Sequence, residues 1–300
     1  MEENIKPTLS VIVSFFDAIE HYTRFIDMCP YHSNVEVIFV NDGCSEPYDL
    51  DRFHAREDFK YFELHENSGI YLARSFGVKN ASGRYLWHVD IDDIIIPSAF
   101  NIVLTKIEVY DGAIIEFNNI HKYHIYNKEI SRLFLSKLFR YFYSSPPLGS
   151  FGYVWNKLIP VELWPFYDLR SLNWHWDTVL NFSFKTNNWV YSSESIILYV
   201  TGHNSVTVQS KTVSDRSFRI FKDIIDILGT DELNYTIVIR HIALSTRRSN
   251  YDIFIANRIS FFSTIMAIDE LTIVNRIERR LLFVLPNKLV YLYLRYLRIL

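Results

Sequence analysis

The 300-residue chain has few of the features that would indicate a disulfide scaffold or a membrane span. It holds only two cysteines, Cys29 and Cys44, and nine each of glycine and proline. The two cysteines match no metal-binding spacing, so free thiols in a reducing compartment are the simplest interpretation. No run approaches the roughly 20 consecutive apolar residues that cross a bilayer. Residues 1–7 do not form the apolar core of a signal peptide. We therefore expect a cytoplasmic protein.

The sequence also has no large excess of charge, no internal repeat and no low-complexity tract. A net charge of -3 argues against a broad surface for nucleic acid. Apolar residues make up 49% of the chain and charged residues 22%, which is typical of a globular protein and not of a disordered one. The length suits one large domain with a helical extension.

Short apolar runs alternate with helix-like stretches over the first hundred residues. The expected strands are 9–16, 35–40, 61–64, 85–89 and 113–117, and the expected helices are 19–28, 48–56, 70–79 and 97–110. Ser68 is expected to cap the helix at 70–79. The alternation predicts an α/β fold with a mostly parallel sheet. From about residue 214 onward the pattern is helical.

Polar residues follow the predicted strands at their carboxyl ends, where a parallel sheet binds ligands. Asp42, after the second strand, can accept hydrogen bonds from a nucleobase or ribose, or its Asp-Gly turn only caps the next helix. Arg74, in the helix after the third strand, can reach a base or phosphates, or it is a solvated helix residue. The residues alone leave both alternatives open.

Three carboxylates follow the fourth strand in the segment Asp90-Ile91-Asp92-Asp93. They repel one another and are costly to hold together unless a positive charge lies among them. A divalent cation bridging to a diphosphate would supply that charge, because hard cations prefer oxygen ligands. The alternative is a solvated acidic turn.

A fourth polar segment, Asn173-Trp174-His175-Trp176-Asp177, precedes a predicted helix at about 178–185. Asp177 suits a general base, and the tryptophans suit the face of a sugar. The alternative is an Asp that caps the helix beside core aromatics.

In this order, the motifs resemble those of the family 2 glycosyltransferases, which have a GT-A fold. The resemblance covers about residues 8–206. Its motifs are Ser14-Phe15-Phe16-Asp17, Asn41-Asp42-Gly43-Cys44-Ser45, Asn67-Ser68-Gly69 with Ala73-Arg74-Ser75-Phe76-Gly77, Ala81-Ser82-Gly83-Arg84-Tyr85, Asp90-Ile91-Asp92-Asp93, Tyr153-Val154-Trp155-Asn156-Lys157-Leu158, Trp176-Asp177 and 199–207.

The resemblance implies a role for each matching residue. Asp42 and Arg74 would contact the nucleobase, and Asp90 would lie near the ribose and the metal. The nucleotide-sugar site would comprise Ser14, Phe15, Asp42, Asn67, Gly69, Arg74, Asp90 and Ile91. Asp92 and Asp90, with His203, would hold Mn²⁺ or Mg²⁺. Asp177 would deprotonate the acceptor, beside Trp155, Trp174 and Trp176.

The resemblance further implies an inverting enzyme that uses a nucleotide-sugar, with uridine as the expected base, and a glycan or lipid-linked acceptor in surface polysaccharide synthesis. Ser14 and Trp176 differ from the family's usual proline and glutamate. No Gln-x-x-Arg-Trp element is present, which favours single addition. A catalytic domain is expected over 1–210, with a nucleotide-sugar half at 1–118 and an acceptor half at 119–210, followed by a helical region over 211–300.

Three other functions compete with this one. A non-catalytic nucleotide-sugar binding protein is supported by Trp176 in place of a glutamate. A phosphatase with Asp90 as nucleophile fits poorly, because Asp93-Ile94 follows the second aspartate. A sugar nucleotidyltransferase needs a Gly-rich loop after the first strand, and residues 14–20 contain no glycine.

The C-terminal segment 276–300 holds six basic residues against a single acid, Glu278, with leucine, isoleucine and tyrosine between them. Such a segment suits the surface of an anionic membrane, or it packs on the catalytic domain or in a dimer interface. Peripheral membrane contact and an oligomer both stay open.

Overall fold

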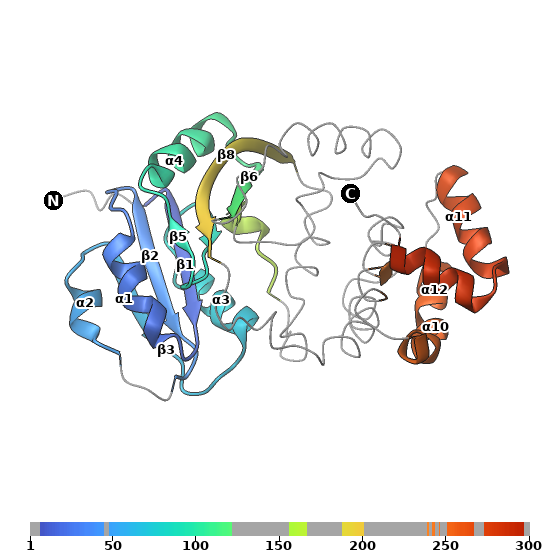
Figure 1. The fold of residues 1–300 in the computed structure, drawn as a ribbon. Helices are drawn as coiled ribbons and strands as arrows, with labels where there is room; N and C mark the ends of the chain where they lie inside the picture. The colour runs from blue at the N-terminus through green and yellow to red at the C-terminus, as the bar shows by residue number, and fades with distance from the viewer. Residues whose placement is uncertain are drawn as a thin grey trace. The chain divides into compact units, whose positions relative to one another are not determined.

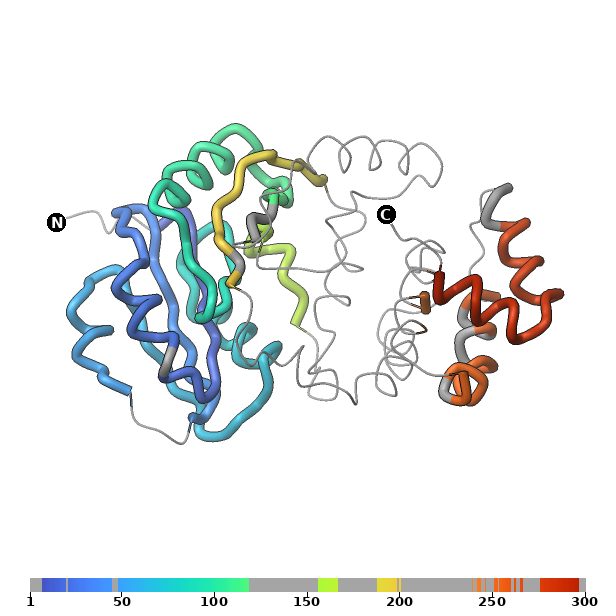
Figure 2. Tube along the Cα trace, viewed as in Figure 1, coloured from blue at the N-terminus to red at the C-terminus, as the bar shows by residue number. Residues whose placement is uncertain are grey.

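A computed structural model of the chain (Figure 1) describes residues 7–44, 48–121, 156–166, 188–200, 239, 242–243, 246, 251–266 and 273–296. Figure 2 colours these parts of the trace by residue number. The chain divides into two compact units. The first, here called the sheet unit, contains residues 1–126 and 152–203, and the second, the helical unit, contains 127–151 and 204–300.

The sheet unit is built on an eight-stranded sheet in the order β3-β2-β1-β4-β7-β6-β8-β5. The strands are β1 (Leu9–Phe15), β2 (Val35–Asn41), β3 (Phe59–Glu63), β4 (Tyr85–His88), β5 (Ile94–Ile95), β6 (Ile114–His121), β7 (Lys157–Pro160) and β8 (Trp189–Tyr199). Strands β1 to β4 pair in parallel, as do β6 and β8, whereas β7 is antiparallel to β4 and β6, and β5 to β8. The α/β class and the mostly parallel sheet are therefore confirmed.

Helices cover both faces of this sheet. They are α1 (Ile19–Met28), α2 (Leu50–His54), α3 (Ile70–Lys79) and α4 (Ala99–Val109), with a short 3₁₀ turn, η3 (Val161–Leu163). Alternate residues of β1 and β2, such as Val11 and Phe39, join the apolar core with residues of α1, α2 and α4. The opposite face carries α3, where Gly77 lies so close to β1 that a Cβ atom would come within 2.6 Å of Ile12 Cγ2. Successive residues of a strand point to opposite faces, which explains this division.

The predicted helices at 19–28 and 70–79 match α1 and α3, and the structure shortens the predicted helix 48–56 to α2. The prediction that Ser68 caps α3 is wrong. The cap residue is Gly69, with φ 91°, and the Ser68 hydroxyl donates to the carbonyl of Glu66. The predicted helix at 178–185 lies outside the described residues.

The helical unit contains α10 (Tyr251–Met266), α11 (Ile273–Val284) and α12 (Asn287–Tyr296), in agreement with the helical pattern of the sequence. Tyr291 of α12 packs against Tyr251 and Phe254 of α10, with ring centroids 5.3 and 5.4 Å apart. Phe283 of α11 packs edge-on against Phe262 of α10. Within the described ranges, no helix has both the length and the apolar character to cross a membrane.

Candidate functional site

The predicted site residues are brought to one edge of the sheet by neighbouring strands. Strands β2, β1 and β4 lie side by side and run parallel, so their carboxyl ends meet. The Asp42 N–H donates to the carbonyl of Phe15 at 2.9 Å, which joins the ends of β2 and β1. The Val89 N–H donates to the carbonyl of Ile12 at 3.0 Å, which extends the pairing of β4 toward the acidic loop.

Asp42 is buried behind the loop that leads into α3. Its Oδ1 accepts from the Ser68 N–H at 2.8 Å, and its Oδ2 accepts from the Gly69 N–H at 2.9 Å. Burial raises the pKa of Asp42, and these two N–H groups partly oppose that rise. Asp42 therefore supplies, from another strand end, the acceptors for the start of α3 that Ser68 does not provide.

Gly43 allows this turn to press against the same loop. Its φ is +74°, and a Cβ atom there would lie 2.4 Å from the carbonyl carbon of Glu66. The turn is closed by Asn41, whose Oδ1 accepts from the Cys44 N–H at 2.8 Å, while its Nδ2 donates to Tyr61 Oη at 2.9 Å. A side chain at position 43 is thus excluded by conformation and by space.

Arg74 is inside the protein and is not the solvated helix residue that the sequence left as an alternative. Its side chain is 1% exposed and forms an ion pair with Asp90. The cation also contributes, after burial, to a pKa of His88 well below the usual value, so this imidazole is neutral. The His88 ring lies against Trp164, with centroids 4.5 Å apart.

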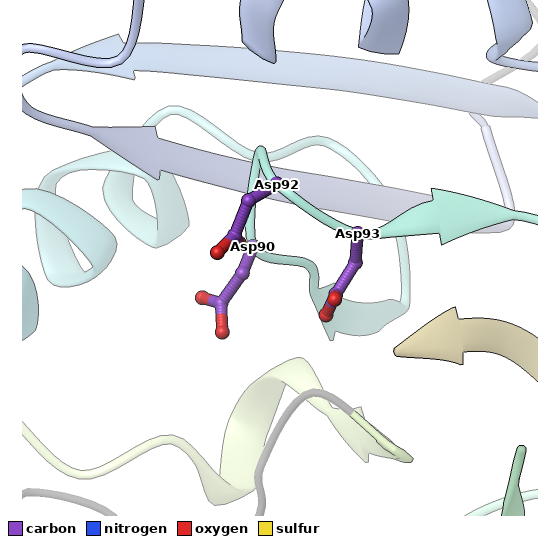
Figure 3. A group of neighbouring side chains, drawn as sticks. All are labelled: Asp90, Asp92 and Asp93. Carbon is purple, nitrogen blue, oxygen red and sulfur yellow. The ribbon is translucent and has the colours of Figure 1, made fainter. Parts of the chain in front are cut away.

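The acidic loop is a tight turn between β4 and β5 (Figure 3). It is closed by the Asp93 N–H, which donates to the carbonyl of Asp90 at 3.0 Å. Ile91 is buried in the apolar core between the aspartates. Figure 3 shows the side chains of Asp90, Asp92 and Asp93 extending to the same side of the loop. One carboxylate oxygen of each lies within 4.8 Å of the others.

The innermost of these carboxyls, that of Asp93, is fully buried. Its Oδ1 accepts from the Val200 N–H at 3.1 Å, and its Oδ2 has no hydrogen-bond partner within the described ranges. Burial, then Asp90 and Asp92, raise the pKa of Asp93 to about 9. Burial also raises the pKa of Asp90, although Arg74 acts in the opposite direction.

A second arginine supports the loop from the other face of the sheet. Arg24, on α1, donates from Nη2 to the carbonyl of Asp92, and its charge acts to lower the pKa of Asp93. No pattern in the sequence points to Arg24, because a lone basic residue in an amphipathic helix gives no sign of its partner. Arginines from α1 and α3 thus provide part of the positive charge that the acidic cluster requires.

The loop fits a divalent cation by its chemistry. Three carboxyl groups offer hard oxygen donors at short mutual distance, and Asp93 Oδ2 is a buried oxygen that the described residues do not satisfy. The predicted ligands Asp90 and Asp92 are therefore brought together. His203, Asp177, Trp155, Trp174 and Trp176 lie outside the described residues.

The other predicted nucleotide-sugar residues surround the same edge. Ser14 is buried at the end of β1, and its Oγ has no hydrogen-bond partner among the residues described. The Phe15 ring packs in the core against Tyr48, with centroids 5.1 Å apart. Asn67 is exposed, and its Oδ1 accepts from the Gly69 N–H at 3.2 Å. Contacts of these residues with a ligand stay a prediction.

Residues 10–156 match the sequence profile of Glycosyl transferase family 2. Glycosyltransferase GlyA of Streptococcus pneumoniae serotype 4 is 25% identical over 174 residues, covering 52% of this chain and 25% of that protein. The uncharacterized glycosyltransferase EpsJ of Bacillus subtilis is 31% identical over 98 residues, covering 31% of this chain and 28% of that protein. The chain thus spans only about a quarter of the length of these two relatives.

Two solved structures share the fold. S. aureus TarS 1–349, in complex with UDP-GlcNAc, has a TM-score of 0.56 and 14% identity, covering 87% of this chain and 82% of that one. The mannosyltransferase PcManGT of Pyrobaculum calidifontis, in complex with GDP-Man and Mn²⁺, has a TM-score of 0.55 and 10% identity, covering 97% and 86%. At these identities the likeness concerns the fold alone.

Proposed function

We propose that this chain, whose residues 10–156 match the profile of Glycosyl transferase family 2, transfers a sugar from a nucleotide-sugar to a hydroxyl group of a glycan or lipid-linked acceptor. The observation that carries this proposal is the group of three carboxyls at the carboxyl end of β4, held between Arg24 and Arg74. In a parallel sheet, this edge is where ligands bind.

The sugar donor would bind along the ends of β1, β2 and β4. Asp42 and Arg74 would face the nucleobase and Asp90 the ribose, with further contacts from Ser14, Phe15, Asn67, Gly69 and Ile91. We propose a uridine diphosphate sugar, in line with the UDP-GlcNAc and UDP complexes of the TarS structures. The ion pair between Arg74 and Asp90 supports a shared role for these two residues at the nucleotide.

Asp90 and Asp92, with His203, would hold Mn²⁺ or Mg²⁺. When bound, such an ion would stabilise the negative charge that develops on the departing nucleoside diphosphate. Arg24 would keep the Asp92 backbone in place, since its guanidinium donates to that carbonyl. The ion in the PcManGT complex is Mn²⁺, and the identity of the ion here is part of the proposal.

Asp177 would take the proton of the acceptor hydroxyl as that oxygen attacks the anomeric carbon from the face opposite the leaving group. A single displacement of this kind inverts the anomeric configuration. Trp155, Trp174 and Trp176 would line the acceptor side. We place the catalytic domain at 1–210 and the helical region at 211–300, and we propose one addition per encounter in surface polysaccharide synthesis.

Turnover of UDP-sugars tests the proposal. We expect hydrolysis or transfer that requires Mn²⁺ or Mg²⁺ and is lost with a chelator. Asp92→Asn and Asp177→Asn should each lower the rate by about 100-fold or more, the usual range for losing a catalytic group. Asp111→Asn is the matched control, since Asp111 is exposed and pairs only with the exposed Arg84 among the described residues. Near-normal rates in Asp177→Asn would show that the base is misassigned.

Trp176 in place of the family's glutamate favours one competing function, a nucleotide-sugar binding protein without turnover. Such a protein would bind UDP with Mn²⁺ but release no UDP from any sugar donor over prolonged incubation. Calorimetric binding measured beside the turnover assay separates the two functions.

A further inference from the structure

Helix α11 exposes an apolar stripe. Ile277, Leu281 and Val284 recur at the spacing of one helix face and are between 52% and 82% exposed. The helix is nevertheless anchored from its other side, because Leu282 is buried and the Phe283 ring packs against α10. Packing within the helical unit therefore accounts for one face of α11 and leaves the apolar stripe on the outside.

Helix α12 repeats this arrangement. Val290, Tyr291 and Leu294 are buried, and the Tyr291 ring packs against α10. The opposite side carries a second exposed stripe at positions i, i+3, i+4 and i+7. We call the two stripes together the outer apolar surface, which consists of Ile277, Leu281, Val284, Leu289, Leu292, Tyr293 and Tyr296. An exposed apolar stripe on each of two successive helices is more apolar surface than scattered single residues would give, and such surface often marks an interaction site.

The helices that carry the outer apolar surface are strongly basic. Residues 273–296 contain Arg276, Arg279, Arg280, Lys288 and Arg295, against the single acid Glu278. Arg276, Arg280 and Lys288 are exposed. Glu278 is engaged by the Tyr293 hydroxyl, which donates to its carboxylate. Because the whole chain has a net charge of -3, this positive charge is a local concentration and not a general property.

Two partners could cover the outer apolar surface: a second copy of the chain or a lipid bilayer. The charge and the residue types of the surface favour one of them. A second copy joined by two-fold symmetry would bring the same cations face to face, which opposes association. A bilayer with anionic headgroups instead offers phosphates to the arginines and lysine, an apolar boundary to the leucines, and an interface that favours tyrosine. We propose that the outer apolar surface binds the surface of an anionic lipid bilayer, with α11 and α12 lying along the interface.

Flotation of the full chain with lipid vesicles tests this inference and needs no sugar donor. We expect the protein to float with vesicles of phosphatidylcholine and phosphatidylglycerol, and to stay at the bottom with phosphatidylcholine alone. Added salt should lower the bound fraction, because screening weakens attraction between exposed charges. Absence of flotation with both vesicle types would overturn the proposal.

Matched variants locate the surface. Leu281→Glu combined with Val284→Glu should weaken vesicle binding by about tenfold or more, since two apolar contacts are lost and two repelling charges added. Val109→Glu is the control: Val109 is 63% exposed at the end of α4 in the sheet unit. Equal weakening by the control would show that the surface is misidentified.

Light scattering tests whether the outer apolar surface instead forms a dimer interface. A dimer that Leu281→Glu dissociates, together with no lipid dependence, would identify a second copy as the occupant and contradict the proposal. Circular dichroism of each variant shows that the fold is retained. UDP-sugar turnover in vesicle-free buffer should be the same in Leu281→Glu and the unchanged chain, so failure of membrane binding and failure of the proposed catalytic function are distinguishable.

Discussion

Asp42 accepts hydrogen bonds from two backbone N–H groups at the start of α3 while lying at the edge where a nucleotide would bind. The sequence left open a base contact and a turn that only caps the next helix. The capping alternative is wrong as stated, because α2, the next helix, is capped by Asp49, and Asp42 caps α3 instead. The base contact stays a prediction. The observed capping acts across elements, because the residues joined are 26 and 27 positions apart. The side chain keeps the Ser68-Gly69 loop in the position from which Arg74 reaches Asp90.

Replacing Asp42 should reveal this structural role in stability measurements. We expect Asp42→Ala to lower the free energy of unfolding by about 1–3 kcal/mol, because the Ser68 N–H loses its acceptor and the Gly69 N–H keeps only the longer bond to Asn67 Oδ1. Asp42→Asn retains one acceptor oxygen, so its free energy of unfolding should lie between those of Asp42→Ala and the unchanged chain. Urea unfolding followed by fluorescence measures the difference. Asp111→Ala, at an exposed position, should change stability little, and a similar loss there would mean that Asp42 has no special structural role.

At the level of elements, the motifs of the sheet unit separate into those that build the site and those that hold the sheet. Glu36, on β2, accepts from Ser10 Oγ and from the Ser82 and Gly83 N–H groups, and it pairs with Lys60. The Ala81–Tyr85 motif thus joins β4 to β1 and β2 at their amino ends. This motif is part of the family resemblance, but its role here is to hold the strands together. The candidate site lies at the opposite, carboxyl ends of the same strands.

The turn after β2 contacts the loop before α3 at Gly43. Substitution of Gly43 tests how much this contact contributes to stability. Gly43 and Gly112 have nearly equal positive φ values, +74° and +75°, but only Gly43 has backbone atoms close to a Cβ position. Gly112→Ala should cost about 1–2 kcal/mol from conformation alone. Gly43→Ala should cost about 1–3 kcal/mol more, because the chain must also move away from Glu66. Thermal or urea unfolding measures both, and equal costs would contradict the close packing.

At the scale of the whole molecule, the proposed activity should appear as ligand-dependent stability. A ligand at 100 times its dissociation constant stabilises the folded state by about 2.7 kcal/mol. We expect UDP with Mn²⁺ to raise the melting temperature of the full chain, and UDP with a chelator to raise it less. Asp92→Asn should remove the contribution of the metal, and Asp111→Asn should keep it. No shift with any nucleoside diphosphate would contradict a nucleotide-sugar site.

The features that depend on neighbouring residues can be predicted from the amino-acid sequence alone. The apolar runs predicted β1 to β4, and their alternation with helices predicted a parallel arrangement, because burial periodicity is a local property. The three carboxylates of the acidic loop were recognisable for the same reason: their mutual repulsion follows from their spacing alone. The family resemblance, built on these segments, also came from the order of motifs along the chain.

The contacts between groups far apart in the sequence become visible only in the folded structure. Arg24 supports the carbonyl of Asp92 across 68 positions of sequence, Asp42 replaces Ser68 at the start of α3, and β7 enters the sheet antiparallel between β4 and β6. The outer apolar surface is a further example, since the sequence of α11 and α12 shows amphipathic helices but not which face packs inward. Such contacts depend on how the folded elements pack against one another. Local sequence patterns reflect only neighbouring residues, so they do not predict a partner far along the chain.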